Sequence, residues 1–230
     1  MARTARIAPG GLVYHVLNRG VGKIRLFQSR KDHVAFQRCL IEALKRNPIR
    51  LIGYCVMPTH WHLLLWPERD GELAGFMMWL TNTHVRRWLA AHRQVGSGHL
   101  YQGRYKNFAV KSDEHLSTVD RYIARNAVRA KLAERAELWP WSAVGQGQLE
   151  AELRVPLTPG PVKRRQDWLA WVNQAQTAAE EEAIRRCIRQ SRPFGDDRWL
   201  SRTMRQLGWT EPRPPGRPKK RHQKSGAVPV

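Results

Sequence analysis

The sequence of 230 residues carries 40 Lys and Arg against 19 Asp and Glu, which gives a formal net charge of +21. Its hydrophobic content of 42%, with 10 Trp, excludes a chain that is disordered throughout, and its length allows one or two domains with a sizeable core. A surface this basic repels itself, so the composition favours a polyanionic partner, with nucleic acid ahead of a membrane surface. The alternative is a basic protein without such a partner.

The cysteines and the hydropathy pattern bear on location. Cys39, Cys55 and Cys187 are far apart in apolar surroundings, which predicts buried thiols in a reducing compartment. No N-terminal stretch resembles a signal peptide, and no run approaches the roughly 18 apolar residues of a membrane span. We therefore expect a cytoplasmic, nucleoid-associated bacterial protein with no membrane partner.

The first half of the chain predicts three strands and a helix. Apolar residues alternate over residues 12–18 and recur at helical spacing over residues 30–46. Strand patterns over 49–57 and 60–66 flank Pro58-Thr59, which predicts a hairpin.

The second half adds two helices and a strand before the composition changes. A helix is expected from Gly71 to about His92, a strand over 103–110, and a long helix over 113–135. The order strand, helix, strand, strand, helix, strand, helix is typical of the α+β class. It predicts a ferredoxin-like four-stranded antiparallel sheet with helices on one face.

The chain divides into three predicted parts. Residues 1–147 form the core domain, residues 148–210 a helical C-terminal extension, and residues 211–230 a basic, Pro-rich tail that we expect to be flexible. Within the extension, helices are expected over residues 165–178, 180–190 and 196–208.

The motif His60-Trp61-His62 is the first candidate site. Side chains alternate along a strand, so His60 and His62 point the same way, with Cα atoms about 6 to 7 Å apart. Two imidazoles at that separation can converge on one divalent cation. The alternative is two partly exposed histidines without a metal.

The helix over 113–135 carries the second candidate site. Tyr122 and Asn126 are four residues apart and so share a helix face, and Arg121, Arg125 and Arg129 repeat on a neighbouring face. A phenol can act as a nucleophile, an amide oxygen can complete a metal site, and guanidinium groups can hold phosphates. The alternatives are a boundary tyrosine, a capping amide and a solvated basic face.

Together these motifs resemble a known family. Met57-Pro58-Thr59-His60-Trp61-His62, followed by Tyr122-x-x-x-Asn126-x-Val128-Arg129-Ala130, is similar to the REP-associated tyrosine transposases, in the single-tyrosine branch of the HUH (histidine, hydrophobic, histidine) nucleases. The similarity runs from about Tyr14 to Trp141. One departure is Ala127, where the family often has proline, and this change should ease the helix.

The resemblance implies an enzyme with a ferredoxin-like HUH core over residues 1–147. Such enzymes cut and rejoin single-stranded DNA near hairpin-forming repeats. By motif, His60 and His62 would be metal ligands, Asn126 the third ligand, and Tyr122 the nucleophile that forms a 5′-phosphotyrosine and leaves a 3′-hydroxyl. The cofactor would be Mg²⁺ or Mn²⁺, and two imidazoles with one amide favour Mn²⁺ in affinity.

Several alternatives stay open at this point. Tyr101 and Tyr105 are rival nucleophiles, although neither has a candidate metal ligand one helical turn away. The chain could instead be a non-catalytic protein that binds hairpin or repeat DNA, or an RNA-binding protein. It could act as a monomer or a homodimer, with Tyr122 supplied by either chain.

Candidate DNA contacts are basic side chains near the motifs and in the tail. The tail segment Pro215-Gly216-Arg217-Pro218-Lys219-Lys220 resembles an AT-hook core, which enters the minor groove. The full set is Arg19, Arg86, Arg87, Arg104, Lys106, Arg121, Arg125, Arg129, Arg217, Lys219 and Lys220.

Overall fold

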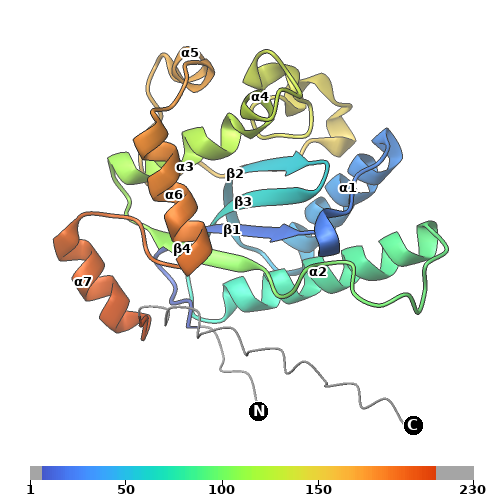
Figure 1. Ribbon diagram of the computed structural model, residues 1–230, viewed down its shortest axis with the longest axis horizontal. Coiled ribbons are helices and arrows are strands. Elements are labelled where there is room, and N and C mark those ends of the chain that lie inside the picture. Colours follow the sequence, from blue (N-terminus) through green and yellow to red (C-terminus); the bar gives the residue numbers. More distant parts are fainter. Residues whose placement is uncertain (1–6, 211–230) are drawn as a thin grey trace, which may run out of the picture.

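The structure, a computed structural model of the chain, describes residues 7–210. Its centre is a four-stranded antiparallel sheet in the order β2-β3-β1-β4 (Figure 1). The strands are β1 (Val13–Arg19), β2 (Arg50–Met57), β3 (His60–Trp66) and β4 (Lys106–Val110). The predicted α+β class and ferredoxin-like sheet are confirmed.

Two long helices cover one face of this sheet. α1 (Arg30–Arg46) begins with a capping box between Ser29 and Asp32, and α2 (Glu72–Ala91) follows Gly71, whose φ of 84° suits glycine. Each helix packs its apolar stripe against the sheet. The core on this side includes Tyr14, Phe36, Leu40, Trp61, Phe76 and Leu80.

The opposite face of the sheet is also covered, by α3 (Glu114–Ala124), α4 (Asn126–Arg129) and α6 (Ala178–Gln190) (Figure 1). The prediction of helices on one face holds for α1 and α2 and is wrong for α3. Helices cover both faces because the central strands have apolar residues on both faces, and both sets must be buried. Examples of the second core are Cys55, Leu64, Phe108, Val119, Ile123 and Cys187.

The predicted long helix over 113–135 is shorter and interrupted. α3 ends at Ala124, Arg125 has ψ near 0°, and α4 ends at Arg129, after which Lys131 takes a φ of 56°. These backbone angles turn the chain away from a continuous helical axis. Tyr122 is therefore on α3 and Asn126 on α4.

Residues that follow the last strand pair with the outer strands of the sheet. On β2, Val56 N–H donates to Trp141 O, Tyr54 O accepts from Ala143 N–H, and Leu51 O accepts from Thr158 N–H. Beside β4, Phe194 N–H donates to Ala109 O. Both outer strands thus have partners for part of their backbone, which blunts edge-to-edge association.

The remaining elements are short. They are η1 (Val21–Lys23), η2 (Ala136–Leu138), η3 (Gln146–Gln148), η4 (Ala151–Leu153), α5 (Trp168–Asn173) and α7 (Asp197–Gln206). The helix expected over 165–178 is reduced to α5. Cys39, Cys55 and Cys187 are buried free thiols, as predicted. No helix within residues 7–210 is long and apolar enough to cross a bilayer.

Candidate active site

The two histidines of β3 lie next to each other on the sheet face that α3 and α4 cover. Their ring centroids are 5.0 Å apart, and Trp61 between them points into the core on the other face. This is the alternation that the strand pattern predicts. His60 is partly buried and His62 is 3% exposed.

Both imidazoles are neutral at neutral pH. Burial, with the nearby guanidinium groups of Arg19 and Arg129, lowers the pKa of His60 to about 4. Burial, followed by the neighbouring His15, lowers the pKa of His62 well below its ordinary value. A neutral imidazole keeps a nitrogen lone pair, which is the form that binds metals.

The hydrogen bonds of these rings leave the same atom available on each. Nδ1 of His60 lies 2.9 Å from Thr59 Oγ1, and Nδ1 of His62 lies 2.8 Å from His15 Nε2. The two Nε2 atoms therefore remain for a ligand. This arrangement fits a cation bound between the two histidines.

Tyr122 faces the histidines from α3. Its ring centroid is 6.2 Å from that of His62, and the side chain is nearly buried at 4% exposure. The guanidinium carbon of Arg129 lies 3.9 Å from the centre of the Tyr122 ring, and its Nη2 donates to Asn126 Oδ1 at 2.9 Å. Arg129 therefore ties the phenol of α3 to the amide of α4.

These side chains share one pocket of about 680 Å³. It contains the predicted nucleophile and all three predicted metal ligands, and one chain supplies them all. Among residues 7–210 no Asp or Glu lines it, whereas six basic residues do: Arg19, Arg104, Lys106, Arg129, Arg185 and Arg189. A pocket with this charge suits a phosphate group.

Comparison with known proteins gives the family. The family model described as "Transposase IS200 like" matches residues 10–126, which contain the histidine pair, Tyr122 and Asn126. This chain belongs to that transposase family. The predicted membership of the tyrosine transposases is confirmed.

Two solved structures are similar to this transposase. One is described as a REP-associated tyrosine transposase bound to a REP hairpin, with 18% identity and a TM-score of 0.49, over 72% of this chain and 98% of that one. The other is a candidate transposase from Deinococcus radiodurans R1, with 20% identity and a TM-score of 0.39, over 53% and 95%. No curated protein matches this sequence.

The donor set of the transposase pocket fits a divalent cation. His60 and His62 offer two neutral nitrogens, and the carbonyl oxygen of Asn126 has a second lone pair besides the one that Arg129 uses. Two imidazoles and an amide oxygen suit a borderline metal such as Mn²⁺.

Another group that could hold a metal ion lies at the start of α3. Asp113, Glu114 and His115 bring ligand atoms within 4.8 Å of one another. Asp113 also caps α3 by accepting from His115 N–H, and Lys111 Nζ lies 2.7 Å from its Oδ2. These contacts account for the group as a helix cap, and none of its members lines the transposase pocket.

Some predicted DNA contacts lie elsewhere. Buried Arg121 donates to the backbone oxygens of Gln174 and Ala175, and Arg125 donates to that of Asn173. These two arginines therefore connect the C-terminal end of α5, and the two residues after it, to the C-terminal end of α3, a role that helical spacing alone did not show.

Other predicted contacts lie on the far side of the molecule or outside the described residues. Arg86 and Arg87 line a separate surface hollow over α2, where Arg87 pairs with Glu42 at 2.7 Å. The tail residues Arg217, Lys219 and Lys220 fall outside residues 7–210.

The rival tyrosines are separated from the histidine pair. Tyr101 is 7% exposed in the core of the α1–α2 face, and its oxygen lies 2.9 Å from Trp61 Nε1 and 2.7 Å from His84 Nδ1. Burial raises the pKa of this phenol far above its ordinary value. Tyr105 lines a different cavity.

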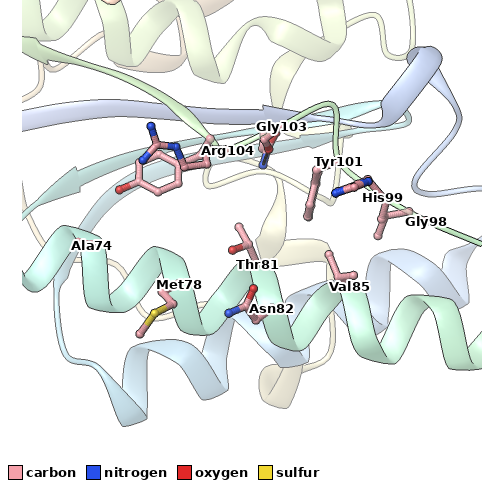
Figure 2. A pocket seen from close by; sticks show the side chains of 13 residues that line it. Ala74, Met78, Thr81, Asn82, Val85, Gly98, His99, Tyr101, Gly103 and Arg104 are labelled. Atoms are coloured by element: carbon pink, nitrogen blue, oxygen red, sulfur yellow. Dashed lines mark hydrogen bonds between the residues drawn. The ribbon is translucent and has the colours of Figure 1, made fainter. Parts of the chain in front are cut away.

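That different cavity lies between α2 and the segment that leads into β4. Figure 2 shows Met78, Thr81 and Asn82 of α2 opposite Gly103 and Arg104. Its volume is about 680 Å³, and it shares Asn18, Gly103 and Arg104 with the transposase pocket. The two hollows are therefore neighbours along one surface.

The sequence did not single out Arg185 and Arg189 of α6, which line the pocket, or His15 of β1, which is buried behind His62. Alternation along residues 12–18 placed His15 on the face of Val13 and Leu17, but the pairing of β1 with β3 was needed to bring it to His62. α6 reaches the pocket only through tertiary packing.

Proposed function

We propose that this transposase is a divalent-metal-dependent endonuclease and strand transferase for single-stranded DNA beside hairpin-forming repeats. The observation that supports the proposal best is that Tyr122, His60 and His62 line one basic pocket, which no carboxylate of the described residues lines. The similar transposase that is described as bound to a REP hairpin suggests the kind of DNA.

In the proposed reaction, the Tyr122 oxygen attacks the scissile phosphorus in line with the leaving group. The phenol loses its proton as the bond between phosphorus and the phenol oxygen forms, and the leaving 3′ oxygen takes up one proton as its bond to phosphorus breaks, which gives a 5′-phosphotyrosine and a free 3′-hydroxyl. A cation held by His60, His62 and Asn126 would neutralise phosphate charge. Because the ester conserves the bond energy, attack by another 3′-hydroxyl can rejoin the strand without ATP.

The basic side chains around the pocket bind and orient the strand. Arg19, Arg104 and Lys106 are exposed at its mouth, where they can contact phosphates on either side of the scissile bond. Arg185 and Arg189 of α6 are exposed and form ion pairs with Glu181 and Glu182, respectively. Ion pairs at the surface are weak, so a phosphate can compete for these arginines.

The neighbouring cavity provides a place for unpaired bases that flank the scissile phosphate. It combines the exposed side chain of Met78 with Tyr105, whose ring can stack on a base, and the Asn82 amide, which can reach base edges. Arg104 stands between the two hollows and can hold the connecting phosphate.

A covalent-adduct experiment tests the proposed function. The chain is incubated with Mn²⁺ and a labelled hairpin-flanked oligonucleotide and then denatured. We expect an adduct that withstands denaturation, and we expect Tyr122→Phe and His60→Ala to abolish it. Tyr101→Phe is the matched control, because it removes a phenol from the opposite face of the sheet and should keep the adduct.

Two results would contradict the proposal. An adduct retained by Tyr122→Phe would refute the nucleophile. Tight hairpin binding that is unaffected by His60→Ala, with no cleavage under any metal, would instead identify a DNA-binding protein with a vestigial site. Competition between matched RNA and DNA strands separates both from an RNA-binding protein.

A further inference from the structure

His15 is a fully buried histidine that the proposed reaction does not use directly. It lies on β1 diagonally across from His62, since Leu17 is the residue opposite His62 and His15 is opposite Leu64. The two rings stack with centroids 4.9 Å apart and an interplanar angle of 21°, and Phe108 packs against the edge of His15. The bond between His15 Nε2 and His62 Nδ1 is 2.8 Å long.

This bond has two proton arrangements. At 2.8 Å, His15 Nε2 and His62 Nδ1 form a hydrogen bond, in which one of the two nitrogens carries the proton and the other accepts it. If His15 Nε2 carries the proton of this bond, the single ring N–H proton of a neutral His62 is on its Nε2, and that atom cannot bind a cation. If His62 Nδ1 carries it, His62 Nε2 has a free lone pair.

We propose that His15 is a positioning residue that accepts the Nδ1 proton of His62 and so holds His62 in the tautomer able to bind a divalent cation. The inference rests on the proposed metal site at His60 and His62. Thr59 Oγ1 contacts Nδ1 of His60 in the corresponding way. Both proposed histidine ligands thus have their Nδ1 held by a neighbouring side chain, one a hydroxyl and the other an imidazole.

The other ring nitrogen of His15, Nδ1, supports the interpretation that His15 acts only through its hydrogen bond with His62. His15 Nδ1 is buried and has no hydrogen-bond partner among residues 7–210. A buried polar atom without a partner destabilises a fold, so packing does not explain an imidazole here. The bond to His62 is the one hydrogen bond of the His15 side chain in the described part of the chain.

Three variants of the full chain test the proposal through Mn²⁺ affinity, measured by calorimetry without DNA. His15→Met removes the acceptor at similar size and should weaken Mn²⁺ binding about 10- to 100-fold, as loss of an outer hydrogen bond to a ligand does. His15→Gln places an amide oxygen near the position of Nε2 and should restore most of the affinity. His84→Met, at a buried histidine of the opposite face, should leave it unchanged.

Nitrogen NMR of the unmodified chain with labelled histidine tests the tautomer even if His15→Met does not fold. With Zn²⁺ as a diamagnetic substitute, we expect His62 to carry its proton on Nδ1, with coupling across the hydrogen bond to His15 Nε2. A proton on His15 Nε2 in the loaded state would overturn the proposal.

The outcomes separate this role from the metal site itself. Wild-type Mn²⁺ affinity in a folded His15→Met chain would overturn the role of His15 alone. Failure of the unmodified chain to bind Mn²⁺ would overturn the metal site and, with it, the proposed function.

Discussion

At the scale of single residues, Arg129 contacts both the ring of Tyr122 and the amide of Asn126. Its guanidinium plane stacks on Tyr122 and hydrogen-bonds Asn126, so one side chain constrains both. Lysine has the same charge but lacks the planar fork that makes these two contacts together. Orientation of reacting groups within a fraction of an ångström strongly affects rate.

We therefore expect Arg129→Lys to slow single-turnover cleavage by about 100-fold while hairpin affinity changes little. Arg125→Lys is the control, since Arg125 is one helical turn away and donates to Asn173 O outside the pocket. Equal losses of rate in the two variants would argue against a special role for Arg129.

At the scale of elements, the segment after Trp139 is fastened closely beside β2. Gly145 lies at a turn where an added Cβ would come within 1.9 Å of Trp139 O, whereas a Cβ at Gly147 would meet no atom of residues 7–210 within 4 Å. The two glycines are two residues apart, so they give a matched pair of substitutions.

We expect Gly145→Ala to lower the free energy of unfolding by about 2 kcal/mol or more, because backbone must move to remove the clash. Gly147→Ala should be neutral or slightly stabilising, since it mainly restricts the unfolded chain. Urea unfolding of both variants measures the difference. Equal stabilities would show that the segment is packed less closely than the structure indicates.

At the scale of the whole molecule, positive charge should govern DNA affinity. If about six duplex phosphates are contacted, the logarithm of affinity should fall against the logarithm of salt concentration with a slope of about −5. Lys106→Ala should reduce that slope by about one unit, since Lys106 is exposed at the pocket. Arg86→Ala, in the hollow over α2, should leave the slope unchanged. A reduced slope in this variant would indicate that the surface over α2 also contacts DNA.

The buried histidines should also make the stability of the whole fold depend on pH. Burial lowers the pKa of His15 and His84 from 6.5 to about 3, so the unfolded chain binds more protons than the native chain between these values. Stability is thus fully present above pH 6.5 and is lost as the pH falls toward 3, by about 1.4 kcal/mol per pH unit for each such histidine.

Urea unfolding at pH 7, 6 and 5 measures this dependence. His84→Met should reduce the slope of the free energy of unfolding against pH by about the contribution of one titrating group. It removes one of the groups that stay neutral only in the native state. A free energy of unfolding that does not change between pH 7 and 5 would contradict the assignment of buried, neutral histidines.

Short-range spacing was enough for the parts of the site that depend on one element. His60 and His62 share a face because a strand alternates, and Tyr122 stays near Asn126 because the chain is locally helical, even across the break at Arg125. The strand and helix order likewise predicted the sheet and its class. The second covered face was missed, although the unbroken apolar runs of the central strands were in the sequence.

The tertiary structure alone decided which distant side chains join those motifs. His15 meets His62 across 47 residues because β1 pairs with β3 in one register, and a shift of one residue would turn it to the other face. Tertiary packing also places Arg121 and Arg125 within hydrogen-bond distance of backbone carbonyls, and it places Arg129 over the ring of Tyr122. Periodicity assigns a residue to a face, but it does not say what will pack against that face.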